Sequence, residues 1–317
     1  MVEAIGFTLL GLVFLALGGD SLVKGAAGLA ERLRIPRFAA GLGLVAVATS
    51  LPELAVNARA VASGDSALAL GNAVGSNIAN IGLTLGAAAL AAPLVLRWRA
   101  LSPLLAVLLL ATVAVALLSL DGGLSRVEGV VLLLVFVVVV VFAARRADDE
   151  SPEVRAEVDA FAATRGGLGL NTGRVVLAAV LLWFGAGWIV AQVPVIGQAL
   201  GMDSLVAGLV LVAIGTALPE AAAAVAAARR GQGDIVAGHV IGSSLFNLLV
   251  VLGGMAAISG MVPVPASFVR LELPAAFLFA LLLVPLLRGN TTVSRGEGAL
   301  LLVALLAWLA LEFALLG

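Results

Sequence analysis

The chain has 317 residues, of which 62% are hydrophobic and 12% are charged. A soluble globular domain has an apolar share of about half and a charged share of about a quarter, so this composition excludes an ordinary soluble enzyme and predicts an integral membrane protein. The 18 basic and 19 acidic residues nearly cancel, which leaves no basic field for nucleic acid. With no cysteine and one histidine, His239, metal-ion chemistry would have to use oxygen ligands.

Hydropathy predicts an all-α integral membrane protein with ten transmembrane helices. A spanning helix needs about 20 mostly apolar residues, and short charged or Gly/Pro-containing turns separate ten such stretches. They lie near 4–22, 38–61, 67–92, 102–120, 127–143, 175–192, 204–228, 234–258, 268–287 and 297–316. We expect the first to be a retained span and not a signal peptide, because Glu3 and no basic residue precedes its apolar run.

The basic residues predict the orientation of these spans. Ten spans place both termini on one side, and 15 of the 18 Lys and Arg residues fall in one of the two sets of loops. Basic residues collect in cytoplasmic loops. We therefore expect a multi-pass protein of the cell inner (plasma) membrane with both termini extracytoplasmic and the longest loop, 144–174, in the cytoplasm.

An internal repeat divides the chain. At an offset of 167, residues 41–86 align with 208–253 without a gap, and 18 of the 46 positions are identical. The pairs that discriminate are Thr49/Thr216, Pro52/Pro219, Glu53/Glu220, Gly71/Gly238, Gly75/Gly242, Ser76/Ser243 and Asn80/Asn247. Five helices per copy is an odd number, so the second copy enters the membrane inverted, as in many secondary transporters. The predicted domains are two five-helix repeats, 1–143 and 175–317, joined by a cytoplasmic linker, 144–174.

Two glutamates lie at the centre of predicted spans. Glu53 and Glu220 each follow a proline. Because proline has no N–H, the backbone carbonyl four residues before each proline lacks its helical hydrogen-bond donor. A charged side chain at the bilayer centre costs about 2.5–3.5 kcal/mol, so such a residue indicates a functional site. The alternative is a protonated, hydrogen-bonded structural carboxyl. Together the two glutamates supply a charge of about −2, which matches one divalent or two monovalent ions.

Helical spacing places further oxygen donors beside these carboxylates. Residues 46, 49, 50 and 53 share one helix face, and residues 76 and 80 lie one turn apart on the next helix. Carboxylate, hydroxyl, amide and carbonyl oxygens suit Ca²⁺ or Na⁺. The alternative for the hydroxyl and amide groups is hydrogen bonding between helices.

Four segments carry a family resemblance. AVATSLPE (46–53) with GNAVGSNIAN (71–80), and AIGTALPE (213–220) with GHVIGSSLFN (238–247), resemble the two α-repeats of the calcium/cation antiporter superfamily, above all the prokaryotic sodium/calcium exchangers. The resemblance implies exchange of Na⁺ for Ca²⁺ by alternating access, without a cofactor. It implies that the ions are bound by Thr49, Ser50, Glu53, Ser76, Asn80, Thr216, Glu220, Ser243 and Asn247, with backbone oxygens of Ala46 and Ala213.

The chain departs from the family pattern at four positions of the second repeat. The family usually has serine at the position of Ala217, so a hydroxyl expected in a Na⁺ site is absent. Asn247 stands where aspartate is frequent, which leaves two central carboxylates. His239 and Ser244 each replace an asparagine. His239 is interpreted as a polar packing group or as a pH sensor.

Several functions remain open from the sequence. A Na⁺/Ca²⁺ antiporter that exports Ca²⁺ is the leading hypothesis, and a H⁺/Ca²⁺ or other divalent-cation antiporter would use the same two glutamates for protons. A cation channel would conduct without a counter-ion gradient. An intramembrane enzyme lacks support, since the chain offers no histidine pair, cysteine or nucleotide motif. The expected partners are Ca²⁺, Na⁺ or H⁺ and the lipid bilayer, with no nucleic acid and an open oligomeric state.

Overall fold

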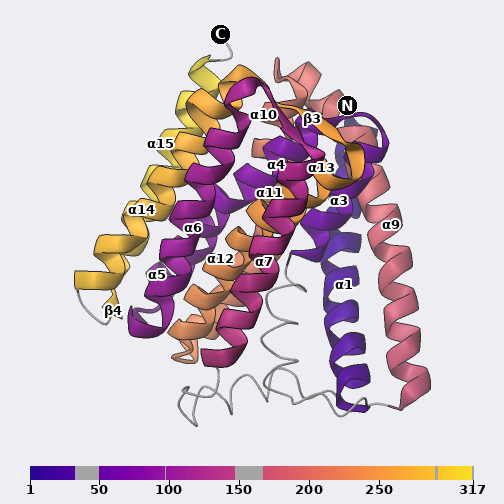
Figure 1. Ribbon diagram of the computed structural model, residues 1–317. Coiled ribbons are helices and arrows are strands. Elements are labelled where there is room, and N and C mark those ends of the chain that lie inside the picture. The colour runs from indigo at the N-terminus through magenta and orange to yellow at the C-terminus, as the bar shows by residue number, and fades with distance from the viewer. Residues whose placement is uncertain (33–49, 97, 147–166, 290–291, 316–317) are drawn as a thin grey trace.

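The computed structural model describes residues 1–32, 50–96, 98–146, 167–289 and 292–315, and it is a bundle of long helices (Figure 1). The first half contains α1 (Val2–Arg32), α3 (Leu51–Ala62), α4 (Ser66–Ala79), the π-helical η1 (Asn80–Leu85), α5 (Gly86–Ala91), β1 (Leu94–Val95), α6 (Trp98–Leu118), the 3₁₀ turn η2 (Ser119–Asp121), β2 (Gly123–Ser125) and α7 (Arg126–Arg146). The predicted helical fold is confirmed for this half.

The second half resembles the first in its central elements. It contains α9 (Leu168–Ala199), α10 (Ser204–Ala207), the π-helical η4 (Gly208–Val212), α11 (Ala213–Arg229), α12 (Gly233–Phe246), the π-helical η5 (Asn247–Leu252), α13 (Gly253–Ser259), β3 (Met261–Pro263), the π-helical η6 (Phe268–Glu272), α14 (Leu273–Gly289), β4 (Thr292–Val293) and α15 (Arg295–Leu315). The pair α4 and η1 recurs as α12 and η5 at the same offset of 167 residues. The repeat seen in the sequence therefore extends to the local backbone geometry.

Short strands are the one departure from an all-helical chain within the described residues. β1 pairs with β4 and β2 pairs with β3, each in antiparallel register. Figure 1 places β3 at one end of the bundle and β4 at the other. Each pair satisfies backbone N–H and C=O groups where the chain leaves a helix, which explains why two or three residues adopt this pairing.

Seven helical stretches among the described residues are long and apolar enough to cross a membrane. They are Val2–Ala26, Ser66–Ala91, Leu101–Asp121, Leu168–Ala199, Ser204–Arg229, Gly233–Ser259 and Arg295–Leu315. The other three predicted spans coincide with α3, α7 and the joined η6 and α14, and residues 38–49 of the second span lie outside the described part.

The outer helices present apolar side chains to the surroundings. On α7, Leu134 is 59% exposed and Val138 is 67% exposed, and on α15 Leu306 is 64% exposed. A soluble protein rarely exposes a continuous apolar surface of this kind, whereas lipid tails accept it. The fold is that of a multi-pass membrane protein.

Helices α1 and α9 lie side by side at one edge of the bundle (Figure 1). A Cβ added at Gly11 would lie 3.0 Å from the carbonyl oxygen of Gly185, and one added at Gly25 would lie 2.9 Å from that of Asn171. Later residues of α1 contact earlier residues of α9, so the two helices are antiparallel. Glycine permits this close approach of their backbones.

Helix α4 makes a second close contact, with the helix formed by α10, η4 and α11. A Cβ at Gly71 would collide with the carbonyl oxygen of Leu205, and a Cβ at Gly75 would lie 2.6 Å from that of Leu209. Gly208 meets the backbone of Leu68 from the other side. Small residues thus bring the first repeat against the helix that carries Glu220.

The Gly75 contact predicts the cost of added volume. Gly75→Ala should lower the thermal unfolding temperature in detergent, because the helices must separate to admit the methyl group, at about 1–3 kcal/mol for such overpacking. Gly6→Ala in α1 is the matched control, since nothing lies within 4 Å of its added Cβ. Equal unfolding temperatures for the two variants would contradict this account of the interface.

Candidate cation-binding site

The predicted ligands that the structure describes lie on two pairs of helices. Ser50 is the N-cap of α3, Glu53 is in its first turn, and Pro52 is at its start. The remaining described ligands are Ser76 in α4, Asn80 at the start of η1, Ala213, Thr216 and Glu220 in α11, Ser243 in α12, and Asn247 at the start of η5. Ala46 and Thr49 lie outside the described residues.

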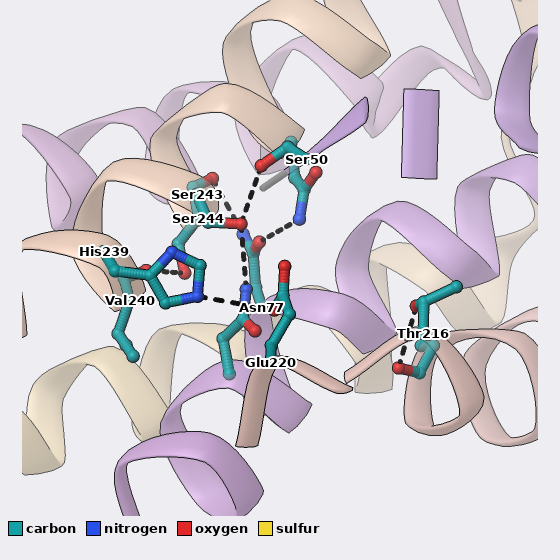
Figure 2. Close-up of polar contacts among 11 residues, drawn as sticks. Ser50, Asn77, Thr216, Glu220, His239, Val240, Ser243 and Ser244 are labelled. Carbon is teal, nitrogen blue, oxygen red and sulfur yellow. Dashed lines mark hydrogen bonds and ion pairs between the residues drawn. The ribbon is translucent and has the colours of Figure 1, made fainter. Parts of the chain in front are cut away.

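Ser243 links three of these elements. Its hydroxyl lies 2.8 Å from the Ser50 hydroxyl and accepts a hydrogen bond of 3.1 Å from the side-chain amide of Asn80. Ser50, Ser243 and Asn80 are at most 1% exposed. The contact joins residues of both repeats, so the predicted ligands of the two halves meet in one buried cluster (Figure 2).

Asn77 forms a second link between the repeats. Its amide nitrogen donates to the backbone oxygen of Ser244 at 3.2 Å, and its side-chain oxygen accepts from the Asn247 amide at 3.1 Å. Both hydrogen-bonding sides of Asn77 are therefore occupied (Figure 2). Asn77 holds the two halves together and also fixes the direction in which the Asn247 amide points.

These contacts turn the oxygens of Asn80 and Asn247 away from every donor. Each of the two amides uses its nitrogen in a bond between repeats, and the Oδ1 atom of each is buried without a hydrogen-bond partner among the described residues. Since the two asparagines occupy equivalent positions of the repeat, the arrangement occurs twice.

The carboxylates show the same deficit of donors. Glu53 is 2% exposed, and its carboxylate lies close to that of Glu220 and to the Thr216 hydroxyl. Within the described residues, Oε2 of Glu53 and both oxygens of Glu220 are buried without a hydrogen-bond donor. Two neighbouring carboxylates in this condition repel each other unless positive charge lies between them.

Unpaired buried oxygens of this kind are suited to bind a cation. A buried acceptor without a donor costs about 1–3 kcal/mol, and more when it is charged. In the described part of the chain, no three acidic or histidine side chains come together as a metal-binding group. A cation here would therefore be held by carboxylate, amide and hydroxyl oxygens together, a hard donor set that Ca²⁺ and Na⁺ accept.

Thr216 lies at the boundary of this cluster. Its hydroxyl is 3.1 Å from the carbonyl oxygen of Val212 and 3.2 Å from that of Ala213. The Ala213 carbonyl, a predicted backbone ligand, is thus in contact with a side chain of its own helix. Pro219 has no N–H to offer the carbonyl of Gly215, which interrupts the hydrogen bonding of α11 one turn before Glu220.

A cavity of about 600 Å³ reaches the site from one end of the bundle. It lies between α1, α11 and α12, and its lining includes Thr216, Glu220 and His239 at the site, Asp20 within α1, and Arg230 at the end of α11. The imidazole Nε2 of His239 lies 3.6 Å from Oε2 of Glu220 (Figure 2). Glu220 is accordingly the carboxylate that this cavity reaches.

Some buried polar residues were not singled out from the sequence as parts of a site. Asn72 donates to Asn57 at 2.9 Å, and both are fully buried. Glu272 and Glu312 are 1% and 3% exposed, in helices that are otherwise largely apolar. Their positions near helix ends concealed this burial, because hydropathy does not report which face of a helix meets its neighbours.

Comparison with known proteins agrees with this arrangement. A family model described as "Sodium/calcium exchanger protein" matches residues 3–145 and again residues 170–314. The chain is 35% identical to the putative antiporter CaxA of Alkalimonas amylolytica, over 99% of both proteins. It is 32% identical to the sodium/calcium exchanger MaX1 of Methanosarcina acetivorans, with 96% of this chain and 97% of that protein aligned.

A solved structure is similar over nearly the whole chain. It is that of the sodium-calcium exchanger NCX_Mj soaked with 2.5 mM Na⁺ and 10 mM Sr²⁺, with a TM-score of 0.67 and 28% sequence identity. The alignment covers 98% of each chain. The likeness therefore extends to the whole helix bundle as well as to the motifs.

Asn77 and Asn80 lie one helical turn apart, and we expect their substitution to have different effects. Asn77→Ala should lower the unfolding temperature without added cation, because two buried hydrogen bonds are lost, at about 1–3 kcal/mol. Asn80→Ala should instead raise the Kd for Ca²⁺ by about tenfold or more, since losing even a group outside the ligand shell commonly costs that much. Thermal unfolding and calcium titration of both purified variants measure the two effects, and an Asn80→Ala protein with wild-type Ca²⁺ affinity would remove Asn80 from the site.

Proposed function

We propose that this chain, which belongs to the sodium/calcium exchanger protein family, is a secondary-active antiporter that exchanges Na⁺ for Ca²⁺ by alternating access. One observation carries the proposal. Glu53, Glu220, Asn80 and Asn247 contribute buried oxygens that lack hydrogen-bond donors among the described residues, in two pairs related by the repeat. Cations are the partners that such oxygens lack.

The charge of the site accounts for exchange. Two ionised carboxylates supply a charge of about −2, which one Ca²⁺ neutralises, as two Na⁺ also do. Both ions accept the same hard oxygens, so they compete for one site. Ca²⁺ binds between Glu53 and Glu220, and Na⁺ uses the same oxygens in another grouping. The proposed ligand set is that of the motifs, with Ala46 and Thr49 included.

The arrangement of the chain supports alternating access. We assign ten transmembrane helices to two inverted repeats, 1–143 and 175–317, with 144–174 as the linker. The recurrence of α4 and η1 as α12 and η5, the antiparallel contact of α1 with α9 and the two separate family matches support this assignment. A site between inverted repeats can be exposed to either side by rocking one group of helices against the other.

The cavity gives the site a preferred side. It extends from Glu220 to Arg230, the C-cap of α11, among the helix ends where the basic residues collect. The bias of basic residues assigns these ends to the cytoplasm and both termini to the extracytoplasmic side of the plasma membrane. Ions therefore enter or leave Glu220 from the cytoplasmic side in this conformation.

An H⁺/Ca²⁺ antiporter is the second candidate. Two observations favour it: Ala217 supplies no hydroxyl where the equivalent Ser50 does, and His239 lies beside Glu220. In that mechanism the two glutamates would carry protons in exchange for Ca²⁺. The two candidates share the Ca²⁺ site and differ only in the driving ion.

Gradient experiments with carboxylate variants test the proposal. Proteoliposomes loaded with Na⁺ should take up Ca²⁺ when diluted into Na⁺-free buffer, and Glu53→Gln or Glu220→Gln should abolish that uptake because the charge that holds Ca²⁺ is halved. Glu272→Gln, at a buried glutamate outside the site, is the matched control and should retain uptake. Uptake that follows a pH gradient and ignores the Na⁺ gradient would select the second candidate, and full uptake by both site variants would exclude both.

The missing hydroxyl at position 217 predicts altered competition between the ions. Ala217 is 1% exposed on the helix that carries Glu220, at the position equivalent to Ser50. Ala217→Ser adds an oxygen ligand for Na⁺, so a lower Na⁺ concentration should suffice to inhibit Ca²⁺ binding by half. Calcium titrations at increasing Na⁺ measure the change. An unchanged inhibition constant in a folded variant would place residue 217 outside every Na⁺ site.

A further inference from the structure

The contact between His239 and Glu220 has an unusual length. Nε2 of the imidazole lies 3.6 Å from Oε2 of the carboxylate, and both side chains are 11% exposed. A hydrogen bond between nitrogen and oxygen is about 2.7–3.2 Å long, so this is not one. The two side chains lie next to each other (Figure 2) and both line the cavity, and Nδ1 of His239 is buried without a partner among the described residues.

The separation suits two ligands of one metal ion. Metal–nitrogen and metal–oxygen bonds to a divalent ion such as Zn²⁺ are about 2.0–2.2 Å long, so two such ligands at a tetrahedral angle lie about 3.4 Å apart. The observed 3.6 Å is close to that value. A small shift of either side chain would place both atoms at bonding distance from a shared ion.

The first repeat explains why His239 is free to face Glu220. The equivalent residue there is Asn72, and it donates a 2.9 Å hydrogen bond to Asn57. The position equivalent to Asn57 in the second repeat is Ala224, which has no polar side chain and lines the cavity beside His239. The second repeat has therefore lost the amide pair of the first, and an imidazole beside the carboxylate stands in its place.

We propose that His239 is a cation ligand that, together with Glu220, extends the site to borderline divalent cations of the first transition series, the class of Co²⁺ and Zn²⁺. This inference rests on the cation site of the proposed function and adds a nitrogen ligand to it. Ca²⁺ and Na⁺ take oxygen ligands, whereas imidazole is a preferred ligand of these metals. The unpartnered oxygens around Glu220, with water from the cavity, complete the coordination.

Co²⁺ is the probe, because its affinity and its visible absorption both respond to a nitrogen ligand. Purified full-length protein is titrated with Co²⁺ alone and, separately, with Ca²⁺ at one fixed pH. His239→Asn, which places the residue of the first repeat here, should raise the Kd for Co²⁺ by about tenfold or more. It should also change the Co²⁺ spectrum and lower the ratio of Co²⁺ to Ca²⁺ affinity. An unchanged Kd and spectrum would overturn the proposal.

A second variant keeps His239 and gives its imidazole a hydrogen-bonding partner. Ala224→Asn supplies the partner that Asn57 gives to Asn72, so the new amide should bind the imidazole and weaken Co²⁺ binding in the same direction. This variant decides the matter if His239→Asn does not fold. Full Co²⁺ affinity in Ala224→Asn together with a wild-type spectrum would count against the imidazole as a ligand.

The transport assay separates this inference from the proposed function. If wild-type protein exchanges Na⁺ for Ca²⁺ and His239→Asn leaves the Co²⁺ affinity unaltered, only the histidine ligand is wrong. If wild-type protein binds Co²⁺ through His239 and no Na⁺ or H⁺ gradient moves Ca²⁺, the proposed exchange is wrong and the metal ligand stands.

Discussion

The central constraint on this molecule is a shortage of hydrogen-bond donors around a few buried oxygens. Lipid cannot compensate a buried carboxylate, and Glu53 is closed off inside the bundle, whereas Glu220 lines the cavity. The side-chain amides of Asn80 and Asn247 use their nitrogens elsewhere, in bonds that join the repeats. A cation bound as proposed would compensate these oxygens, which would make the ion site depend on the packing of the membrane fold.

The bonds between repeats have a second consequence. Hydrogen bonds join Ser50 to Ser243, and Asn77 to Ser244 and Asn247. They connect helices of the first repeat with helices of the second. A motion that exposed the site by separating these helices would break buried hydrogen bonds, which is costly in a low-dielectric interior. Alternating access is therefore easier if the helices carrying these contacts move as one body. The glycine-mediated contact between α1 and α9 lies outside this network and places a second pair of helices beside it.

Much of the fold was predictable, because long apolar runs have few alternatives in a bilayer. Most of the candidate ligands followed from one principle, that a polar residue repeated in two apolar helices marks a site. The repeat distinguished Asn80, which recurs as Asn247, from Asn77, which aligns with Ser244, but only the tertiary contacts show that Asn77 is fully hydrogen-bonded while the Asn80 oxygen is not. The π-helical segments that begin at Asn80 and Asn247, and the burial of Glu272, also depend on packing that helical periodicity does not encode.

The two halves of the site are related by the repeat but are chemically different, and three of the differences concern residues of α11 and α12 that belong to the half with Glu220. Ser50, Asn57 and Asn72 form hydrogen bonds around Glu53, and their counterparts are Ala217, Ala224 and His239. Two of these changes remove a neutral polar group, and the third replaces an amide with an imidazole, in the half that the cavity reaches. Glu53 thus lies in a crowded, hydrogen-bonded half, whereas Glu220 lies in an open half with fewer neutral ligands. In the proposed exchanger, an ion that arrives through the cavity meets Glu220 before Glu53, so we expect substitutions in the second repeat to alter which ions enter.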